Sequence, residues 1–69
     1  MAQTIDKTAF LMGYWDGVKT RAHMSDKQAN RYLKGLPAVA IRSYQQGRED
    51  GVNGDSTRKD ALSAVSSAV

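Results

Sequence analysis

Apolar residues recur at helical spacing near the start of the chain. They form two adjacent helix faces, the first made by Ile5, Ala9 and Met12 and the second by Leu11, Trp15, Val18 and Ala22. The pattern predicts a helix from Ile5 to about His23, with Thr4 as its N-cap and Asp6 in its first turn. Because the two faces together exceed a single amphipathic stripe, we expect this helix to contact both its own chain and a second one.

A capping box marks a second, shorter helix. The run from Ser25 to Gln28 reads Ser-x-x-Gln, in which the two side chains satisfy each other's backbone N–H groups. It predicts a helix from Asp26 to Lys34, which Gly35 ends as a left-handed residue.

Pro37 suits the first turn of a third helix, which we expect to run to about Val52 and to stop at Gly54. Its inward residues are then Ala40, Ile41, Tyr44, Gly47, Gly51 and Val52, and its outward residues Arg42, Gln45, Gln46, Glu49 and Asp50. After it, residues 55–69 are rich in alanine and serine and predict either a short C-terminal helix or a flexible tail.

One pattern occurs twice. Aromatic-x-x-Gly-x-x-Asp-Gly-Val spans Phe10–Val18 and again Tyr44–Val52, 34 residues later. Each glycine costs a helix interior about 1 kcal/mol relative to alanine, so a close helix contact is expected to offset the loss. The alternative is that the first glycines are loop residues and the first helix ends near Met12. The predicted helix-packing residues are Gly13, Gly17, Gly47 and Gly51.

These elements predict an all-α fold. We expect an antiparallel helical hairpin in residues 1–54 that turns about residue 30, pairs Gly13 with Gly47 and Gly17 with Ser43, and has the short helix across its open end. The C-terminal residues 55–69 form a separate short element. A chain of 69 residues buries little apolar surface alone. A homodimer is therefore expected, and its predicted interface is formed by Leu11, Trp15 and Val18.

Composition excludes several kinds of site. The chain has no cysteine and one histidine, so neither disulfides nor a thiolate or histidine-based metal site is expected. There is no leader pattern and no apolar run of membrane length, which favours the cytoplasm. His23 lies near Ser25 and Asp26, but the capping role explains Ser25, and Asp16 with Asp50 is interpreted as a pair of polar-face residues. We therefore expect no enzyme activity and no cofactor.

The charge is concentrated in the middle of the chain. Residues 19–48 hold seven Lys or Arg against Asp26 alone, a formal charge of +6, whereas residues 49–69 carry −2. A basic segment indicates an acidic partner, either nucleic acid or an acidic protein surface; the alternative is a solvated helix face. Arg and Tyr are enriched at binding hot spots. The predicted target-binding residues are Lys27, Arg31, Tyr32, Lys34 and Arg42.

Two alternatives concern this segment. Tyr32 fits the core as well as the surface, whereas Leu33 and Leu36 are expected in the core. Residues 26–52 also resemble a helix-turn-helix, but the start of the second helix is apolar where base-reading side chains belong. Direct reading of DNA is therefore disfavoured, and contact with the nucleic-acid backbone stays open.

Two resemblances suggest partners. Residues 13–17, Gly-Tyr-Trp-Asp-Gly, and residues 44–47, Tyr-Gln-Gln-Gly, resemble motifs of ribosome modulation factor, a small basic two-helix protein, which implies RNA or ribosome binding. In length, helical-hairpin pattern and basic middle, the chain also resembles small phage-encoded host-takeover proteins, among them the quorum-sensing anti-activator of a Pseudomonas phage. That resemblance implies a dimer in the host cytoplasm that blocks the DNA-binding domain of a quorum-sensing regulator, and possible inhibition of a pilus assembly ATPase.

Our leading hypothesis from the sequence is a non-enzymatic, dimeric inhibitor of a host protein. The second is an RNA- or ribosome-binding regulator. The third is a structural or regulatory dimer with no partner for its basic segment. Salt separates the first two, since binding to nucleic acid falls steeply as salt rises.

Overall fold

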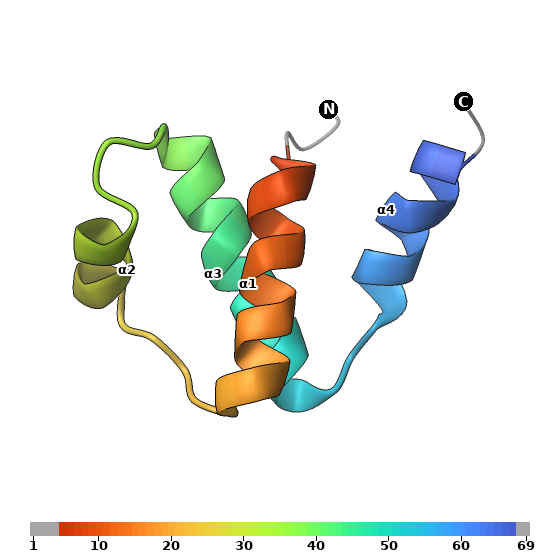
Figure 1. Cartoon of the computed structure of the whole chain (residues 1–69), viewed down its shortest axis with the longest axis horizontal. Helices are drawn as coiled ribbons and strands as arrows, with labels where there is room; N and C mark the ends of the chain where they lie inside the picture. Colours follow the sequence, from red (N-terminus) through yellow and green to blue (C-terminus); the bar gives the residue numbers. More distant parts are fainter. Residues whose placement is uncertain (1–4, 68–69) are drawn as a thin grey trace.

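Four helices make up the regular structure of residues 5–67, the part of the chain that the computed structural model describes, with side chains to residue 62. They are α1 (Lys7–Thr20), α2 (Asp26–Tyr32), α3 (Ala38–Asn53) and α4 (Thr57–Ser67). The predicted all-α class is confirmed for these residues. In Figure 1, α1 and α3 lie side by side in the centre, α2 lies on one side of them and α4 on the other.

The first long helix is shorter than expected at both ends. Asp6 is its N-cap, since the carboxylate accepts a 3.0 Å hydrogen bond from the backbone N–H of Ala9. The predicted cap, Thr4, lies outside the described residues. The helix ends at Thr20, three residues before the expected His23, and Arg21 follows in the left-handed region at φ 55°.

The capping box of α2 is confirmed. Ser25 accepts from the N–H of Gln28, and the Gln28 side chain accepts from the N–H of Ser25. This helix ends at Tyr32, two residues before Lys34, and Gly35 follows in a turn at φ 94°.

Local stop signals also define the second long helix and the last one. Pro37 precedes α3 as its N-cap residue, and Gly54 ends α3 at φ 75° with its N–H directed at the carbonyls of Asp50 and Gly51. After this turn the chain forms α4, the C-terminal helix that was one of two expectations for this segment.

The two long helices are parallel, so the predicted antiparallel hairpin is wrong. A Cβ added to Gly17 would lie 3.0 Å from the backbone N of Val52, and the Asp6 N–H donates a 2.9 Å hydrogen bond to Ser43. The start of α1 therefore lies beside the start of α3, and Ser43 pairs with Asp6 instead of Gly17. Figure 1 shows both helices running in the same direction.

The connection explains why a parallel arrangement is possible. Helix α1 has 14 residues and is about 21 Å long at a rise of about 1.5 Å per residue. Residues 21–37, which include α2, run back along this length before α3 begins. The small stripes on the two helices fit together in either direction, so the sequence spacing alone did not distinguish a tight hairpin from this crossover.

The repeated motif builds the contact between α1 and α3. An added Cβ at Gly13 would meet the backbone of Tyr44 and Arg48, and one at Gly47 would meet that of Phe10 and Tyr14. Adding the repeat offset of 34 to Phe10 and Tyr14 gives Tyr44 and Arg48. The two copies thus contact each other reciprocally, as if related by a two-fold axis parallel to the helices.

Gly17 and Gly51 repeat this reciprocal contact one turn further on, against the backbones of Arg48 and Val52 and of Tyr14 and Val18 respectively. All four glycines are needed for this close approach, because no larger residue fits between the two backbones.

The shorter helices follow the same approximate symmetry. Helix α2 leaves the end of α1 and packs on α3, whereas α4 leaves the end of α3 and packs on α1. On the α2 side, Leu33 lies in the core with Ala9, Ala40 and Tyr44. On the α4 side, Lys59 lies over the ring of Tyr14. Each half of the molecule is therefore a long helix followed by a short one that covers the other half.

Candidate functional site

The surface of α2 presents an aromatic ring between cations. Tyr32 is 61% exposed, and Arg31 and Lys34 on either side of it are exposed as well, as is Lys27 one turn earlier. The Tyr32 ring rests 5.8 Å from that of Tyr44, which is fully buried. This contact restricts the exposed ring to a position beside the core.

The two leucines that flank this surface differ. Leu33 is buried as predicted, whereas Leu36, also predicted for the core, is 44% exposed. Leu36 lies in the turn between α2 and α3, where the chain leaves the core to reach Pro37.

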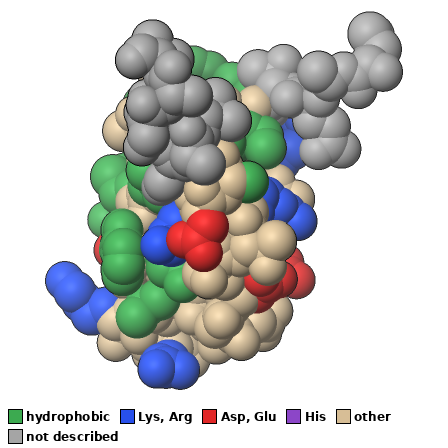
Figure 2. Space-filling view, turned by 90° about the vertical axis from the view of Figure 1, so that its right-hand side faces the viewer, with side chains coloured by type: hydrophobic (Ala, Val, Ile, Leu, Met, Phe, Trp, Pro, Cys, Tyr) green, Lys and Arg blue, Asp and Glu red, His purple; other side chains and the backbone are tan. Residues whose placement is uncertain are grey.

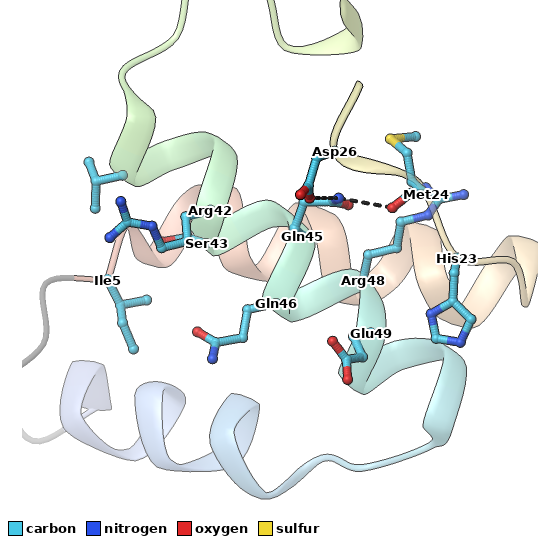
Figure 3. Close-up of a pocket in the computed structure, with 11 residues that line it drawn as sticks. Ile5, His23, Met24, Asp26, Arg42, Ser43, Gln45, Gln46, Arg48 and Glu49 are labelled. Carbon is cyan, nitrogen blue, oxygen red and sulfur yellow. Dashed lines mark hydrogen bonds between the residues drawn. The ribbon is translucent and has the colours of Figure 1, made fainter. Parts of the chain in front are cut away.

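Two hollows border the segment that joins α1 to α2, and His23 and Met24 line both. The smaller, of about 610 Å³, is lined by Arg31 and Tyr32 together with Ala22, His23, Met24, Gln28 and Arg48. The larger, of about 670 Å³, follows the outer side of α3 and is lined by residues from Ile5 and Arg42 at one end to His23 and Glu49 at the other. Figure 3 shows this larger groove, with Gln45 bonded to the Met24 carbonyl and to Asp26 at its rim.

The five predicted target-binding residues therefore do not form one pocket. Arg31 and Tyr32 line the smaller hollow, and Arg42, which is exposed on α3, lines the larger one. Lys27 and Lys34 line neither of these two hollows. The residues that belong together are those of α2 and its following turn, which we name the α2 surface: Lys27, Arg31, Tyr32 and Lys34.

Arg48 ties the end of α1 to α3. Its Nε donates a 2.9 Å hydrogen bond to the carbonyl of Ala22, and its other nitrogens donate to the hydroxyls of Tyr44 and Thr20 at 2.9 and 3.1 Å. The side chain is buried, at 8% exposed, and in Figure 3 it extends toward Met24 and His23. One positive charge of the basic segment is therefore internal, where it also favours the negative end of the α1 dipole.

A second buried group is the Asp50 carboxylate, which was expected to face out. The residue is 9% exposed, and its Oδ2 has no hydrogen-bond donor among the described residues. Burial raises the pKa of this carboxyl, and the guanidinium of Arg58, 3.8 Å away on α4, lowers it in part.

The outer face of α1 carries the predicted dimer residues. Trp15 is 56% exposed and Met12 is 43% exposed, with Leu11 and Val18 half-buried beside them. Figure 2 shows hydrophobic side chains gathered along its left, the side on which α1 lies. Offsets of 34 residues place Gln45, Gln46 and Glu49 at the positions of α3 equivalent to Leu11, Met12 and Trp15, whereas Val18 corresponds to Val52, so most of this apolar face belongs to one half of the molecule.

Tyr14 is buried although it lies beyond the two apolar faces of α1. Its ring is 6% exposed. It lies under α4, with the Lys59 ammonium 5.5 Å from its centroid and the Trp15 ring packed edge-on at 5.1 Å.

The sequence predicts neither a membrane-spanning helix nor a metal site. Within residues 5–67, no helix is long and apolar enough to cross a membrane. In the same part of the chain, no group of three His, Asp or Glu side chains lies close enough to hold a metal ion. Ser25, which lies next to Asp26, is engaged as the cap of α2.

Comparison of the chain with protein-family models, curated proteins and solved structures gives no match. Function must therefore be argued from the surface of the molecule itself.

Arg48 is the site residue that the sequence reasoning missed. A usable signal was present, because Arg48 follows Tyr44 by four residues and so shares its helix face. Tyr44 was predicted to face inward, and the same periodicity places Arg48 there. Its charge instead contributes to the +6 of the basic segment, residues 19–48.

Proposed function

We propose that the protein is a non-enzymatic inhibitor that binds a host protein through the α2 surface. The observation that carries the proposal is the exposed Tyr32 ring, supported from beneath by Tyr44 and flanked by Arg31 and Lys34. Tyr and Arg dominate binding hot spots because they combine large contact area with polar ends. A ring already held in place loses less conformational entropy on binding than a free one.

The charge of the α2 surface limits the kind of partner that it can bind. The charged residues of the α2 surface are basic and outnumber Asp26, the acidic residue at the start of α2, so the complementary partner surface is acidic. The resemblance to phage host-takeover proteins suggests, as targets, the DNA-binding domain of a quorum-sensing regulator and a pilus ATPase. Since a DNA-binding face is itself basic, we propose that contact with such a regulator falls on an acidic part of the domain and that inhibition follows from steric cover. The proposed place of action is the host cytoplasm.

The experiment is capture of partners from a bacterial lysate by the tagged protein, with and without nuclease, followed by mass spectrometry and activity assays of the captured protein. We expect a host protein that is retained after nuclease treatment, is inhibited by the purified chain, and is lost with Tyr32→Ala. Lys19→Ala removes an exposed cation on α1 and is the control. Retention of the same protein by Tyr32→Ala contradicts the assignment of the α2 surface.

A second candidate is an RNA- or ribosome-binding regulator. The same surface favours it, because an exposed aromatic ring between cations suits a stacked base with phosphates on either side. The residues that carry the resemblance to ribosome modulation factor, such as Gly13, Gly17 and Gly47, lie in the helix contact, so they support a shared fold more than a shared partner. Partners that disappear on nuclease treatment, or binding that weakens steeply with salt, favour this candidate.

We also propose the homodimer expected from the sequence, through Leu11, Trp15 and Val18. The support is the apolar outer face of α1, which has polar residues at the positions of α3 equivalent to Leu11 and Trp15. A dimer with no partner for the α2 surface is the remaining alternative, and it predicts a dimer in solution that captures nothing through Tyr32.

A further inference from the structure

The guanidinium of Arg48 is a buried charge that no carboxylate contacts directly; Asp16 is linked to it through the Tyr44 hydroxyl, which accepts from Arg48 and donates to Asp16. Among the described residues, no carboxylate lies within 4.0 Å of it, and its three hydrogen bonds go to the neutral oxygens of Ala22, Tyr44 and Thr20. An arginine side chain has five N–H groups, so these bonds use three of them. A buried cation with no carboxylate in direct contact is costly, and an anion placed beside it lowers that cost.

The smaller hollow gives such an anion a place. It has a volume of about 610 Å³, and its charged or ionisable lining consists of His23, Arg31, Tyr32 and Arg48, with no Asp or Glu. The larger hollow, which borders the same segment, includes Asp26 and Glu49 in its lining. Of the two hollows that Arg48 borders, only the smaller is lined by cationic groups without opposing carboxylates.

We propose that this hollow, between α2 and the end of α1, binds a phosphate-type oxyanion. The guanidinium groups of Arg48 and Arg31 match the geometry of phosphate oxygens, and His23 adds a further donor. Tyr32 also lines this hollow, where its ring can stack on a planar group attached to the phosphate. The site shares Arg31 and Tyr32 with the α2 surface but does not depend on the inhibitory role.

The approximate symmetry of the fold shows that the site is particular to one half. At the position equivalent to Arg48, the other half carries Tyr14, whose ring lies under Lys59 of α4. The buried cation is thus not required by the helix contact itself, since the equivalent contact is made around a neutral residue.

The test is calorimetric titration of the full chain at low salt with three probes: inorganic phosphate, phosphoserine and AMP. Arg31→Gln and Lys34→Gln are the matched variants, because each removes one exposed cation from the same segment and only Arg31 lines the hollow. We expect saturable binding of at least one probe, weakened about tenfold by Arg31→Gln and unchanged by Lys34→Gln. No binding of any probe, or equal weakening by the two variants, overturns the proposal.

Two further measurements localise the anion. In NMR spectra, we expect the Arg48 Nε–H signal to shift on titration, while the backbone signals of α4 stay in place. If saturable binding leaves the Arg48 signal unmoved, the hollow is not the site and the proposal fails. If AMP binds more tightly than phosphoserine and Tyr32→Ala abolishes this difference, the ligand is a nucleotide. Equal affinity identifies the phosphate group alone as the ligand.

Discussion

The hydroxyl of Tyr44 donates a 2.7 Å hydrogen bond to Oδ2 of Asp16, and this bond joins α3 to α1. The approximate two-fold symmetry maps this pair onto Phe10 and Asp50. Phe10 has no hydroxyl, and Asp50 Oδ2 is the buried oxygen without a donor in the described residues. The hydroxyl of Tyr44, which Phe10 lacks, is thus the difference between the Asp16 carboxylate, which has a donor, and the Asp50 carboxylate, whose Oδ2 has none.

Replacement of Phe10 by tyrosine is therefore expected to stabilise the protein. The new hydroxyl would stand where Tyr44 stands in the other half and donate to Asp50, for a gain of about 1 kcal/mol in the free energy of unfolding at neutral pH. It should also lower the pKa of Asp50, since the bond favours the charged form. Urea unfolding measures the gain, and Tyr44→Phe, which removes the existing bond, should cost about 1–3 kcal/mol. A loss of stability in Phe10→Tyr would mean that the buried ring has no room for the hydroxyl.

The Tyr44 hydroxyl also makes stability depend on alkaline pH. Burial raises the pKa of Tyr44 to about 12, and the hydrogen bond to Asp16 raises it as well, whereas Arg48 lowers it. In the unfolded chain this hydroxyl loses its proton near the ordinary value of about 10. Between these values the folded protein holds more protons than the unfolded one, so the free energy of unfolding falls as pH rises from about 10 to about 12.

Unfolding curves collected across this pH interval test the dependence, with Tyr44→Phe as the reference that lacks the group. The difference between the two proteins should narrow as pH rises. In the tyrosinate absorbance of the native protein, one tyrosine should titrate later than the ordinary value. A difference that stays constant over the interval would show that Tyr44 ionises equally in both states.

The third prediction concerns the glycines in the contact between α1 and α3. Gly13→Ala would place a Cβ 2.8 Å from the carbonyl carbon of Tyr44, so α1 and α3 must move apart. We expect a loss of about 1–3 kcal/mol, although alanine favours an isolated helix by about 1 kcal/mol. Thr8→Ala, at an exposed position of α1, is the control and should be neutral or slightly stabilising. Thermal unfolding compares the two, and a more stable Gly13→Ala protein would refute the close contact.

Much of the fold was predictable because its signals are local. The capping box at Ser25 and the stop at Gly54 act through neighbouring backbone groups, and both are confirmed. The helix direction was not predictable in the same way, because stripes containing Gly13 and Gly47 pack in either orientation. The deciding information lies in the path of residues 21–37, which depends on where α2 finds its own contacts.

The candidate site was predictable only in part, for a related reason. Exposure of Lys27 and Arg31 follows from helix periodicity, but the burial of Asp50 beside Arg58 requires α4 to fold back onto the long helices. The burial of Arg48 requires the carbonyl of Ala22, which lies beyond the end of a different helix. Such contacts join segments far apart in the sequence. The residues next to Asp50 and Arg48 in the sequence do not predict them.

The proposed dimer gives the last prediction. Trp15→Ala is expected to shift the protein toward monomer, because it removes the largest apolar group from the outer face of α1. Glu49→Ala changes the equivalent position of α3 and should leave the association unchanged. Sedimentation velocity over a range of concentrations measures each effect, and a wild-type protein that stays monomeric at high concentration would disprove the interface.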